Sequence, residues 1–239
     1  MREMVSFGGG VNSTALVILL ARAGWRGPIV FADTGAELPE TYGHIERFAE
    51  WVEQFDLKVT RLHPHEYPRL YKWKIEGRTL VEFCVGQRWV PMWTRRLCRT
   101  EWKLRPLRRY AREIGVERAL LGIDAGEAHR SKGQARPLVE MGIDRAGCMK
   151  VIEDAGIDVP VRSGCWLCPF RRNAQWRALW EDHRDLYEQA MAIEENSLPS
   201  KAGGMFSVLD PDGVTLRARV ARYETGEWRE QMRMWEVTK

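Results

Sequence analysis

The feature that most restricts the fold is a cluster of three glycines, Gly8 to Gly10, between two apolar segments. The segment before it, Glu3–Phe7, has the length and composition of a short strand. The segment after it, Ser13–Ala23, is apolar on nearly every side, as a buried helix is. A helix of this kind must be covered by other elements, so a strand that turns through glycine into a buried helix predicts an α/β fold.

Strand and helix patterns continue to alternate along the first half of the chain. Further strands are predicted over Ile29–Ala32, Lys58–Leu62 and Arg118–Ile123. Helical spacing follows Pro39 as far as Phe55 and recurs from Leu104 to Ile114. We therefore expect an α/β fold whose parallel sheet carries helices on both faces. A chain of 239 residues suits one such domain with a small mixed C-terminal extension.

Two regions depart from this alternation and set the expected domain limits. Residues 63–94 hold several prolines and tryptophans without a clear period and are predicted to be an insertion in a first domain, 1–170. Residues 171–239 are predicted to form a helical and β-hairpin extension. Its helix begins near Asn173, and its hairpin joins Met205–Leu209 to Val214–Val220.

Composition indicates a globular chain without a membrane partner. Hydrophobic residues make up 44% and charged residues 29%. No apolar run approaches the roughly 20 residues of a membrane span, and no signal peptide is visible, so we expect a cytoplasmic protein. The net charge of +4 is too small to identify a nucleic-acid partner by itself.

Positive charge is concentrated in one segment. Between Thr94 and Arg112 only Glu101 opposes a run of basic residues, namely Arg95, Arg96, Arg99, Lys103, Arg105, Arg108, Arg109 and Arg112. Such a run attracts phosphate groups, on a nucleotide or on a polymer. The alternative interpretation is a solvated helix face.

The glycine cluster has the composition of an anion-binding loop. Glycine lets backbone N–H groups approach an anion closely, and the start of the following helix adds its positive dipole end. Hydroxyl groups of Ser6, Ser13 and Thr14 are further donors. The segment lacks the Gly-Lys-Ser/Thr ending of a Walker loop. A glycine-rich turn with an ordinary helix cap is the structural alternative.

Ser6 to Ala15 resembles the pyrophosphate loop, Ser-x-Gly-Gly-x-Asp-Ser, of the adenine nucleotide alpha hydrolase superfamily. Asn12 stands where the ATP-using members usually have Asp. Phe31 to Thr41 resembles the second-strand motif of phosphoadenosine phosphosulfate (PAPS) reductases, and Gly122 to Arg130 is similar to a later segment of that family. Asp124 stands there where reductases often carry Arg. Cys98 to Leu107 resembles the family's cysteine-then-Lys-x-x-Pro helix.

This resemblance implies a Rossmann-like adenine nucleotide alpha hydrolase fold and a set of site residues. The implied nucleotide-binding residues are Ser6, Gly8, Gly9, Gly10, Ser13, Thr14, Asp33, Thr34, Gly35, Gly122 and Arg130. The implied catalytic residues are Asn12, Ser13, Lys103 and Arg130. For Arg130, a surface ion pair is the alternative interpretation; a guanidinium also matches two phosphate oxygens at once.

Five is an odd number of cysteines for a disulfide framework, and a cytosolic chain should keep them reduced. In cluster-bearing relatives of the family, cysteines at the places of Cys98, Cys165 and Cys168 hold a [4Fe–4S] cluster. The resemblance therefore implies such a cluster here, with Cys148 as the fourth ligand and Cys84 in reserve. A structural Zn²⁺ site and free buried cysteines are the alternatives.

Three functions are compatible with these motifs. The principal hypothesis is cleavage of Mg²⁺-bound ATP to AMP and pyrophosphate, activating a nucleic-acid or protein acceptor for sulfur or nitrogen insertion, with a possible sulfur donor protein. The basic run favours it. The alternative is reduction of PAPS or adenylylsulfate. Family reductases use a cysteine near the C-terminus, whereas the last cysteine here is Cys168. The third is a non-catalytic nucleotide-binding partner, for which Asn12 is the clue.

Overall fold

A computed structural model describes residues 2–66, 77–92, 95–130, 135–197, 209 and 213–225. The chain divides into two compact units, which are described separately. The first comprises Met1–Thr79 with Cys98–Cys165, and the second comprises Leu80–Leu97 with Trp166–Lys239. The expected insertion at 63–94 is thus divided between the two units. Within the described ranges, no helix is both long and apolar enough to span a bilayer.

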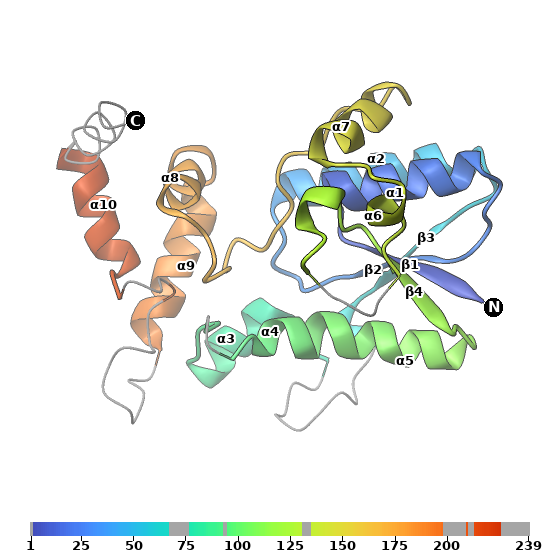
Figure 1. Ribbon diagram of the computed structural model, residues 1–239. Coiled ribbons are helices and arrows are strands. Elements are labelled where there is room, and N and C mark those ends of the chain that lie inside the picture. Colours follow the sequence, from blue (N-terminus) through green and yellow to red (C-terminus); the bar gives the residue numbers. More distant parts are fainter. Residues whose placement is uncertain are drawn as a thin grey trace. The chain divides into compact units, whose positions relative to one another are not determined.

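The first unit is built on a four-stranded parallel sheet in the order β3-β2-β1-β4 (Figure 1). The strands are β1 (Glu3–Phe7), β2 (Ile29–Ala32), β3 (Val59–Leu62) and β4 (Arg118–Leu121). In the central pairs, Val5 lies opposite Ile29 on one side and Leu120 on the other. Each strand agrees with its sequence prediction to within two residues.

Helices cover both faces of this sheet, as predicted. On one face, α1 (Val11–Arg22) and α2 (Pro39–Glu53) pack on Val5, Phe7, Ile29 and Phe31. On the other face, α5 (Arg105–Glu113) packs on Met4, Val30 and Ala32 through Leu107, Tyr110 and Ala111. The alternation of side chains along each strand divides the core into these two layers. The predicted α/β class is therefore confirmed.

Short elements connect the layers of the first unit. A 3-10 turn, η1 (Pro64–Glu66), follows β3, and α4 (Leu97–Arg99) leads into a π-helical segment, η2 (Thr100–Leu104), before α5. After β4 come a second 3-10 turn, η3 (Ala125–Glu127), then α6 (Pro137–Glu140) and α7 (Arg145–Glu153). The sequence predicted one helix from Leu104, without the π-helical segment.

Among the described residues of the second unit, the regular elements are helices. It contains α3 (Leu80–Gln87), α8 (Asn173–Asp182), α9 (Arg184–Asn196) and α10 (Leu216–Thr225). The ring of Tyr187 contacts Trp176 and Trp180 edge-on. The carboxylate of Glu194 accepts hydrogen bonds from the backbone N–H groups of Leu209 and Leu216.

The predicted hairpin is wrong in its second strand. Val214–Val220 alternates apolar and polar residues as a strand does, but Leu216–Thr225 is helical. Glu194 accepts the N–H of Leu216, and the hydroxyl of Tyr187 donates to the Leu216 carbonyl. These contacts from α9 fix the start of the helix and override the local pattern. The expected first strand, from Met205, lies almost wholly outside the described residues.

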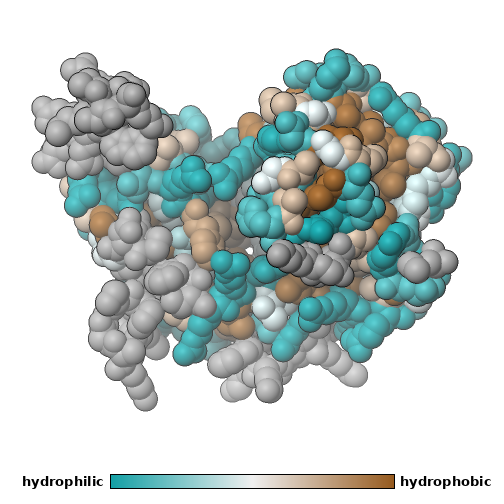
Figure 2. All heavy atoms as spheres, viewed as in Figure 1, coloured by the Kyte–Doolittle hydropathy of each residue, from teal (hydrophilic) through white to brown (hydrophobic). Residues whose placement is uncertain are grey.

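The surface of the first unit differs between its two helical layers. Hydrophilic colouring predominates along α5, whereas hydrophobic colouring gathers over α6 and α7 in Figure 2. Met141 and Met149, beside and within these helices, are 49% and 38% exposed. The outer face of α5 is therefore the charged side of this unit.

Candidate functional site

The strand order places a topological switch point between β1 and β4. From β1 the chain moves outward through β2 and β3, and it then returns to add β4 on the other side of β1. In open α/β sheets, ligands bind outside the carboxyl ends of the strands at such a point. Here the glycine loop after β1 meets the segment after β4: a Cβ on Gly122 would lie 2.6 Å from the backbone of Ser13.

The loop after β1 presents backbone donors that are only weakly occupied. The Ser13 hydroxyl oxygen lies 3.3 Å from the backbone nitrogens of both Gly8 and Gly10 and donates to the Gly10 carbonyl. Bonds of 3.3 Å are longer than a usual N–H···O bond. A phosphate or sulfate oxygen can replace this hydroxyl, so the geometry fits an anion site at the start of α1.

The three glycines have different surroundings. Gly8 is exposed, and an added Cβ would meet only the Ser13 hydroxyl, at 4.0 Å. Gly9 is buried at a φ of +66°, and its Cβ would lie 3.0 Å from Ile45. Gly10 faces Ser163, whose hydroxyl would be 2.5 Å from an added Cβ. Gly8 therefore leaves open space beside the loop N–H groups, whereas Gly9 is required by the fold.

Thr14 has a structural contact rather than an open hydroxyl. Its side chain is fully buried, and its Oγ1 lies 2.9 Å from Nε2 of His44 in α2. Burial, together with the charge of Arg47, lowers the pKa of His44 to about 4, so its imidazole is neutral near pH 7. The sequence predicted Thr14 as a phosphate donor; that role stays a prediction, and the contact with α2 stands against it. Ser6 lies within β1, opposite Val30 and Leu121.

Asn12 links a buried carboxylate to an arginine. Its amide nitrogen donates to Asp124 at 2.7 Å, and its amide oxygen accepts from Arg145 at 3.1 Å. Asn12 and Asp124 are both buried, whereas Arg145 at the start of α7 is exposed. The two departures from the family motifs, Asn12 and Asp124, are thus in direct contact. Sequence reasoning missed Arg145, because 133 residues separate it from Asn12.

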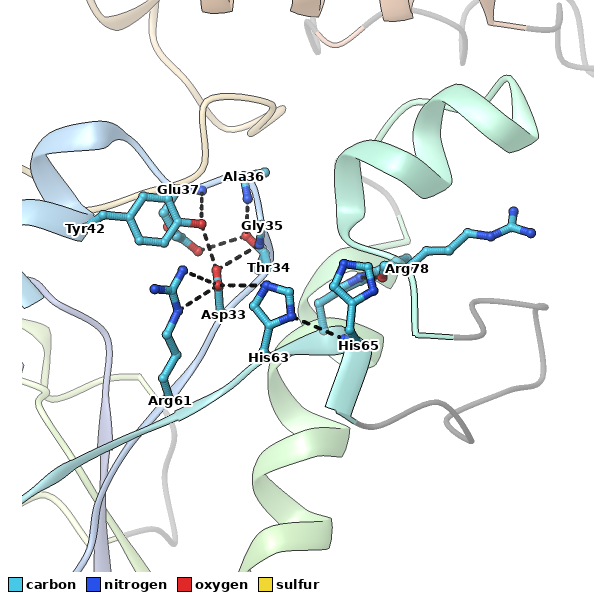
Figure 3. A network of polar contacts seen from close by, with 11 residues as sticks. Asp33, Thr34, Gly35, Ala36, Glu37, Tyr42, Arg61, His63, His65 and Arg78 are labelled. Carbon is cyan, nitrogen blue, oxygen red and sulfur yellow. Dashed lines mark hydrogen bonds and ion pairs between the residues drawn. The ribbon is translucent and has the colours of Figure 1, made fainter.

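Asp33, at the end of β2, is the centre of a saturated polar network (Figure 3). Its carboxylate accepts from the Gly35 N–H at 2.8 Å, the Tyr42 hydroxyl at 2.7 Å, and two Arg61 nitrogens at 2.9 and 2.7 Å. Burial alone would raise its pKa, but the bonds from Gly35, Tyr42 and Arg61 bring the pKa of Asp33 below its ordinary value. Asp33 therefore stays ionised and braces this edge of the sheet.

His63 and His65 extend this network at the end of β3. Their rings stack with centroids 4.8 Å apart, and Nε2 of His63 lies 3.9 Å from the Asp33 carboxylate. Arg78 points away from Asp33 in Figure 3. The contact of Arg61 with Asp33 was not predicted from the sequence, because a charged residue near the end of a strand is a weak signal by itself.

Thr34 and Lys103 meet at Glu37. The Thr34 hydroxyl donates to the Glu37 carboxylate at 3.1 Å, and Lys103 pairs with the same carboxylate oxygen at 2.7 Å. Glu37 is buried, whereas the Lys103 side chain is 37% exposed, so water reaches one side of this pair. The π-helical turn carries Lys103 to this point. Its predicted catalytic role is untested, and here it neutralises Glu37 next to Asp33.

Arg130 lies on the surface beyond η3. Its guanidinium pairs with Glu127 at 2.6 Å, and its side chain is 56% exposed. Arg136 donates to the carbonyls of Ala128 and Arg130 and so fixes the backbone of this segment. The structure thus matches the surface ion pair that the sequence left open for Arg130, and phosphate binding by it stays a prediction.

A second segment runs past the glycine loop. Ser163 approaches Gly10, the Gly164 carbonyl accepts from the N–H of Leu38, and Cys165 forms an isolated antiparallel bridge with Glu37. The backbone from Ser163 to Cys165 therefore spans the distance from the loop to the end of the β2 motif. This brings a half-buried thiol-bearing residue into the loop's neighbourhood.

The positions of the cysteines leave the predicted [4Fe–4S] cluster untested. Among the described residues, no group of three or more His, Cys, Asp or Glu side chains is arranged to hold a metal ion. Cys98, Cys165 and Cys168 are half-buried, whereas Cys84 and Cys148 are buried. Cys148 packs in the apolar core against α1, and burial raises its pKa to about 11. Cys148 thus lies inside the core, and the four-cysteine set stays a prediction.

Comparison with known families identifies the class of this unit. The sequence matches the phosphoadenosine phosphosulfate reductase domain over residues 2–140, more than half of the chain. The chain belongs to this family. The family resemblance seen in the motifs is thereby confirmed, and membership indicates a nucleotide-binding enzyme of the sulfonucleotide-reductase type.

Comparisons with curated proteins and with solved structures give no further assignment. No curated protein matches the chain. Among solved structures, it is similar to phosphoadenylyl-sulfate (PAPS) reductase from Candida auris in its phosphate complex. The sequences are 18% identical, the match covers 70% of this chain and 82% of that chain, and the TM-score is 0.46.

Proposed function

We propose that this family member binds a sulfonucleotide, adenylylsulfate or PAPS, at the β1–β4 switch point and reduces its sulfate group to sulfite. The observation that carries the proposal is the family match over residues 2–140, which includes the whole switch point. The match supports this reaction better than ATP cleavage, which the sequence motifs alone had favoured.

In this reaction, the loop holds the anionic groups of the nucleotide. Backbone N–H groups of Gly8 and Gly10 face the position that the Ser13 hydroxyl now partly fills. A thiolate attacks the sulfate sulfur, the bond from sulfur to the phosphate oxygen breaks, and the nucleotide leaves with the electron pair. A second thiol then attacks the sulfur of the first, which releases sulfite and forms a disulfide. The two thiols thus supply both electrons.

Cys165 is the candidate for the attacking thiol. It lies in the same unit as the loop, it is half-buried rather than buried, and its segment touches Gly10 through Ser163. Cys148, in contrast, is inside the core with a raised pKa. A nucleophilic role for Cys165 excludes a role as cluster ligand, so the two proposals for this residue compete. A dithiol protein or small dithiol serves as the second thiol.

The test is a product assay on protein purified without oxygen. Adenylylsulfate, PAPS and ATP are each incubated with a dithiol, and sulfite, adenosine phosphates and pyrophosphate are measured. We expect sulfite from at least one sulfonucleotide and its loss in Cys165→Ser, with Cys84→Ser unchanged. Pyrophosphate from ATP without sulfite from either sulfonucleotide would overturn the proposal.

Metal analysis of the same preparation decides between the two roles of Cys165. Iron and sulfide in stoichiometric amounts, lost in Cys165→Ser, would support the cluster and contradict the nucleophile. Stoichiometric zinc would support the structural-metal alternative. Protein free of both metals that still releases sulfite would support the nucleophile.

ATP cleavage with a polymeric acceptor remains the second candidate, and the outer face of α5 favours it. Four arginines, Arg105, Arg108, Arg109 and Arg112, line a hollow of about 480 Å³ there. Arg105 and Arg109 also form ion pairs with Glu101 and Glu113. This surface fits a run of phosphate groups. Binding of an oligonucleotide that weakens with salt and with Arg108→Glu, accompanied by pyrophosphate release from ATP, would support this candidate.

A further inference from the structure

The contact between Asn12, Asp124 and Arg145 bears on the kind of nucleotide that the switch point accepts. The Asp124 carboxylate is 4% exposed and adjoins the first turn of α1, where the loop would hold an anion. A buried negative charge in that place repels an incoming phosphate or sulfate unless a cation offsets it. That cation is either a metal ion carried in with the nucleotide or a charged group of the protein.

The Asn12 amide has only one orientation that satisfies both neighbours. An amide nitrogen donates and an amide oxygen accepts, while a carboxylate only accepts and a guanidinium only donates. The nitrogen therefore faces Asp124 and the oxygen faces Arg145, as the distances of 2.7 and 3.1 Å show. The reversed amide would place like partners against each other on both sides. Both polar atoms of Asn12 are thus used within the protein.

Arg145 places a permanent positive charge at the far end of this chain of hydrogen bonds. It is the first residue of α7, it is exposed, and one nitrogen of its guanidinium bonds to Asn12. A guanidinium is charged at every physiological pH. An aspartate at position 12 would keep the contact with Arg145 but would also place a second carboxylate against Asp124, a pair of like charges of the kind that a divalent cation bridges.

We propose that Arg145 is a positioning residue which, through Asn12, offsets the charge of Asp124 and lets the loop bind its nucleotide without a divalent cation. This deepens the proposed function and rests on it.

The experiment is a calorimetric titration of adenylylsulfate, and separately of PAPS, into the full chain, once in EDTA and once in Mg²⁺; the expected values refer to the nucleotide that binds more tightly. For the wild type we expect dissociation constants that differ by less than threefold between the two buffers. Arg145→Ala should weaken binding at least tenfold in EDTA, and Mg²⁺ should recover at least threefold of that loss because Asp124 then takes a cation. A purely structural role for Arg145 would not produce the recovery.

Arg22→Ala is the matched control. Arg22 is an exposed arginine at the opposite end of α1 whose side chain also makes one inter-element hydrogen bond, to the Asp154 carbonyl. It should bind like the wild type in both buffers. Asn12→Asp is the second variant, and its binding should become dependent on Mg²⁺. Thermal melting of each variant checks that it is folded.

Three results would overturn the inference: loss of wild-type binding in EDTA, unchanged binding by Arg145→Ala in EDTA, or weakened binding by that variant with no recovery in Mg²⁺. Failure of the proposed function is distinguishable, since the wild type would then bind no sulfonucleotide in either buffer. In that case both proposals fall together.

Discussion

Polar residues follow the carboxyl ends of two strand pairs, β1–β4 and β2–β3, but their hydrogen bonding differs. At the β1–β4 switch point, Gly8 is exposed and the loop N–H groups have only long bonds to Ser13. At the β2–β3 edge, Asp33 accepts short bonds from three other residues and is fully buried. The backbone N–H groups at the switch point can still donate to a ligand, whereas the polar groups around Asp33 already bond to one another and stabilise the fold. Of these two places, only the switch point leaves hydrogen bonds incomplete, so that a ligand can complete them.

The largest effect should come from Gly8→Val. The added side chain projects into the anion position without meeting the core, because only the Ser13 hydroxyl lies within 4.0 Å of a new Cβ. We expect nucleotide affinity to fall at least about 100-fold while the melting temperature changes little. Titration calorimetry and thermal melting measure the two quantities.

Gly9→Val is the contrasting variant for that experiment. Its Cβ would lie 3.0 Å from Ile45, and its φ of +66° is unfavourable for a β-branched residue. It should lower the melting temperature markedly. If Gly8→Val bound nucleotide as the wild type does, the switch point would not be the site.

Asp33→Asn, at the end of β2, should lower stability and leave nucleotide affinity nearly unchanged, the reverse of Gly8→Val. Loss of the buried carboxylate weakens its bonds from Arg61 and Tyr42 and should lower the free energy of unfolding by about 3 kcal/mol. The loss stays at the low end for a broken buried pair, because the Arg61 side chain is 45% exposed and water screens its charge. Sulfonucleotide affinity should change less than threefold. A large loss of affinity in a fully folded variant would show that Asp33 contacts the ligand.

The pH dependence of stability distinguishes His44, which contacts Thr14 after the glycine loop, from Asp33 at the end of β2. Its pKa is about 4 in the folded protein and 6.5 when unperturbed, so the unfolded chain binds the proton more tightly. The associated stability is complete above pH 6.5 and is lost as the pH falls towards 4. Between pH 7 and 4.5 we expect a loss of about 2 kcal/mol, measured by urea unfolding.

His44→Gln is the control, since glutamine can keep the bond to Thr14 without titrating. Its stability should not show this loss over the same range. The lowered pKa of Asp33 acts in a different window, because its stabilising charge is lost only below its ordinary value of 3.8. A loss that persisted in His44→Gln between pH 7 and 4.5 would have to come from another group.

The smallest effect is expected for Tyr42→Phe. The hydroxyl donates to Asp33 at 2.7 Å, while the ring lies under the Arg61 guanidinium at 4.9 Å and would remain. The variant also loses the long contact of 3.4 Å that the hydroxyl accepts from the Glu37 N–H. Because Asp33 retains its other donors, the unfolding free energy should fall by only about 1 kcal/mol. Denaturant titration resolves a change of this size. An effect equal to that of Asp33→Asn would mean that the hydroxyl, not Arg61, dominates the brace.

The sequence predicted the sheet and its helices because their signals are local. The apolar strands and the helical spacing after Pro39 lie within single elements, and the structure reproduces them. The glycine loop was also visible, although its three glycines could not be told apart. Only the packing of Ile45 and Ser163 against the loop shows that Gly8 alone faces open space.

Contacts between distant residues account for most of what the sequence missed. Arg145 reaches Asn12 across 133 positions, and Arg61 reaches Asp33 across 28. Neither stands in a motif. The helix from Leu216 was missed for a related reason, because the carboxylate that caps it belongs to Glu194 in another helix.

Amide hydrogen exchange tests the contrast between the two edges most directly. It would be followed on the wild type with and without saturating adenylylsulfate. We predict that the slowing of amide exchange is largest at residues 8–13, where the loop N–H groups are weakly bonded in the free protein. Residues 33–37 should change less, since Gly35 and Ala36 already donate within the fold. Slowing confined to residues 33–37, with an unchanged loop, would contradict the assignment of the switch point as the nucleotide site.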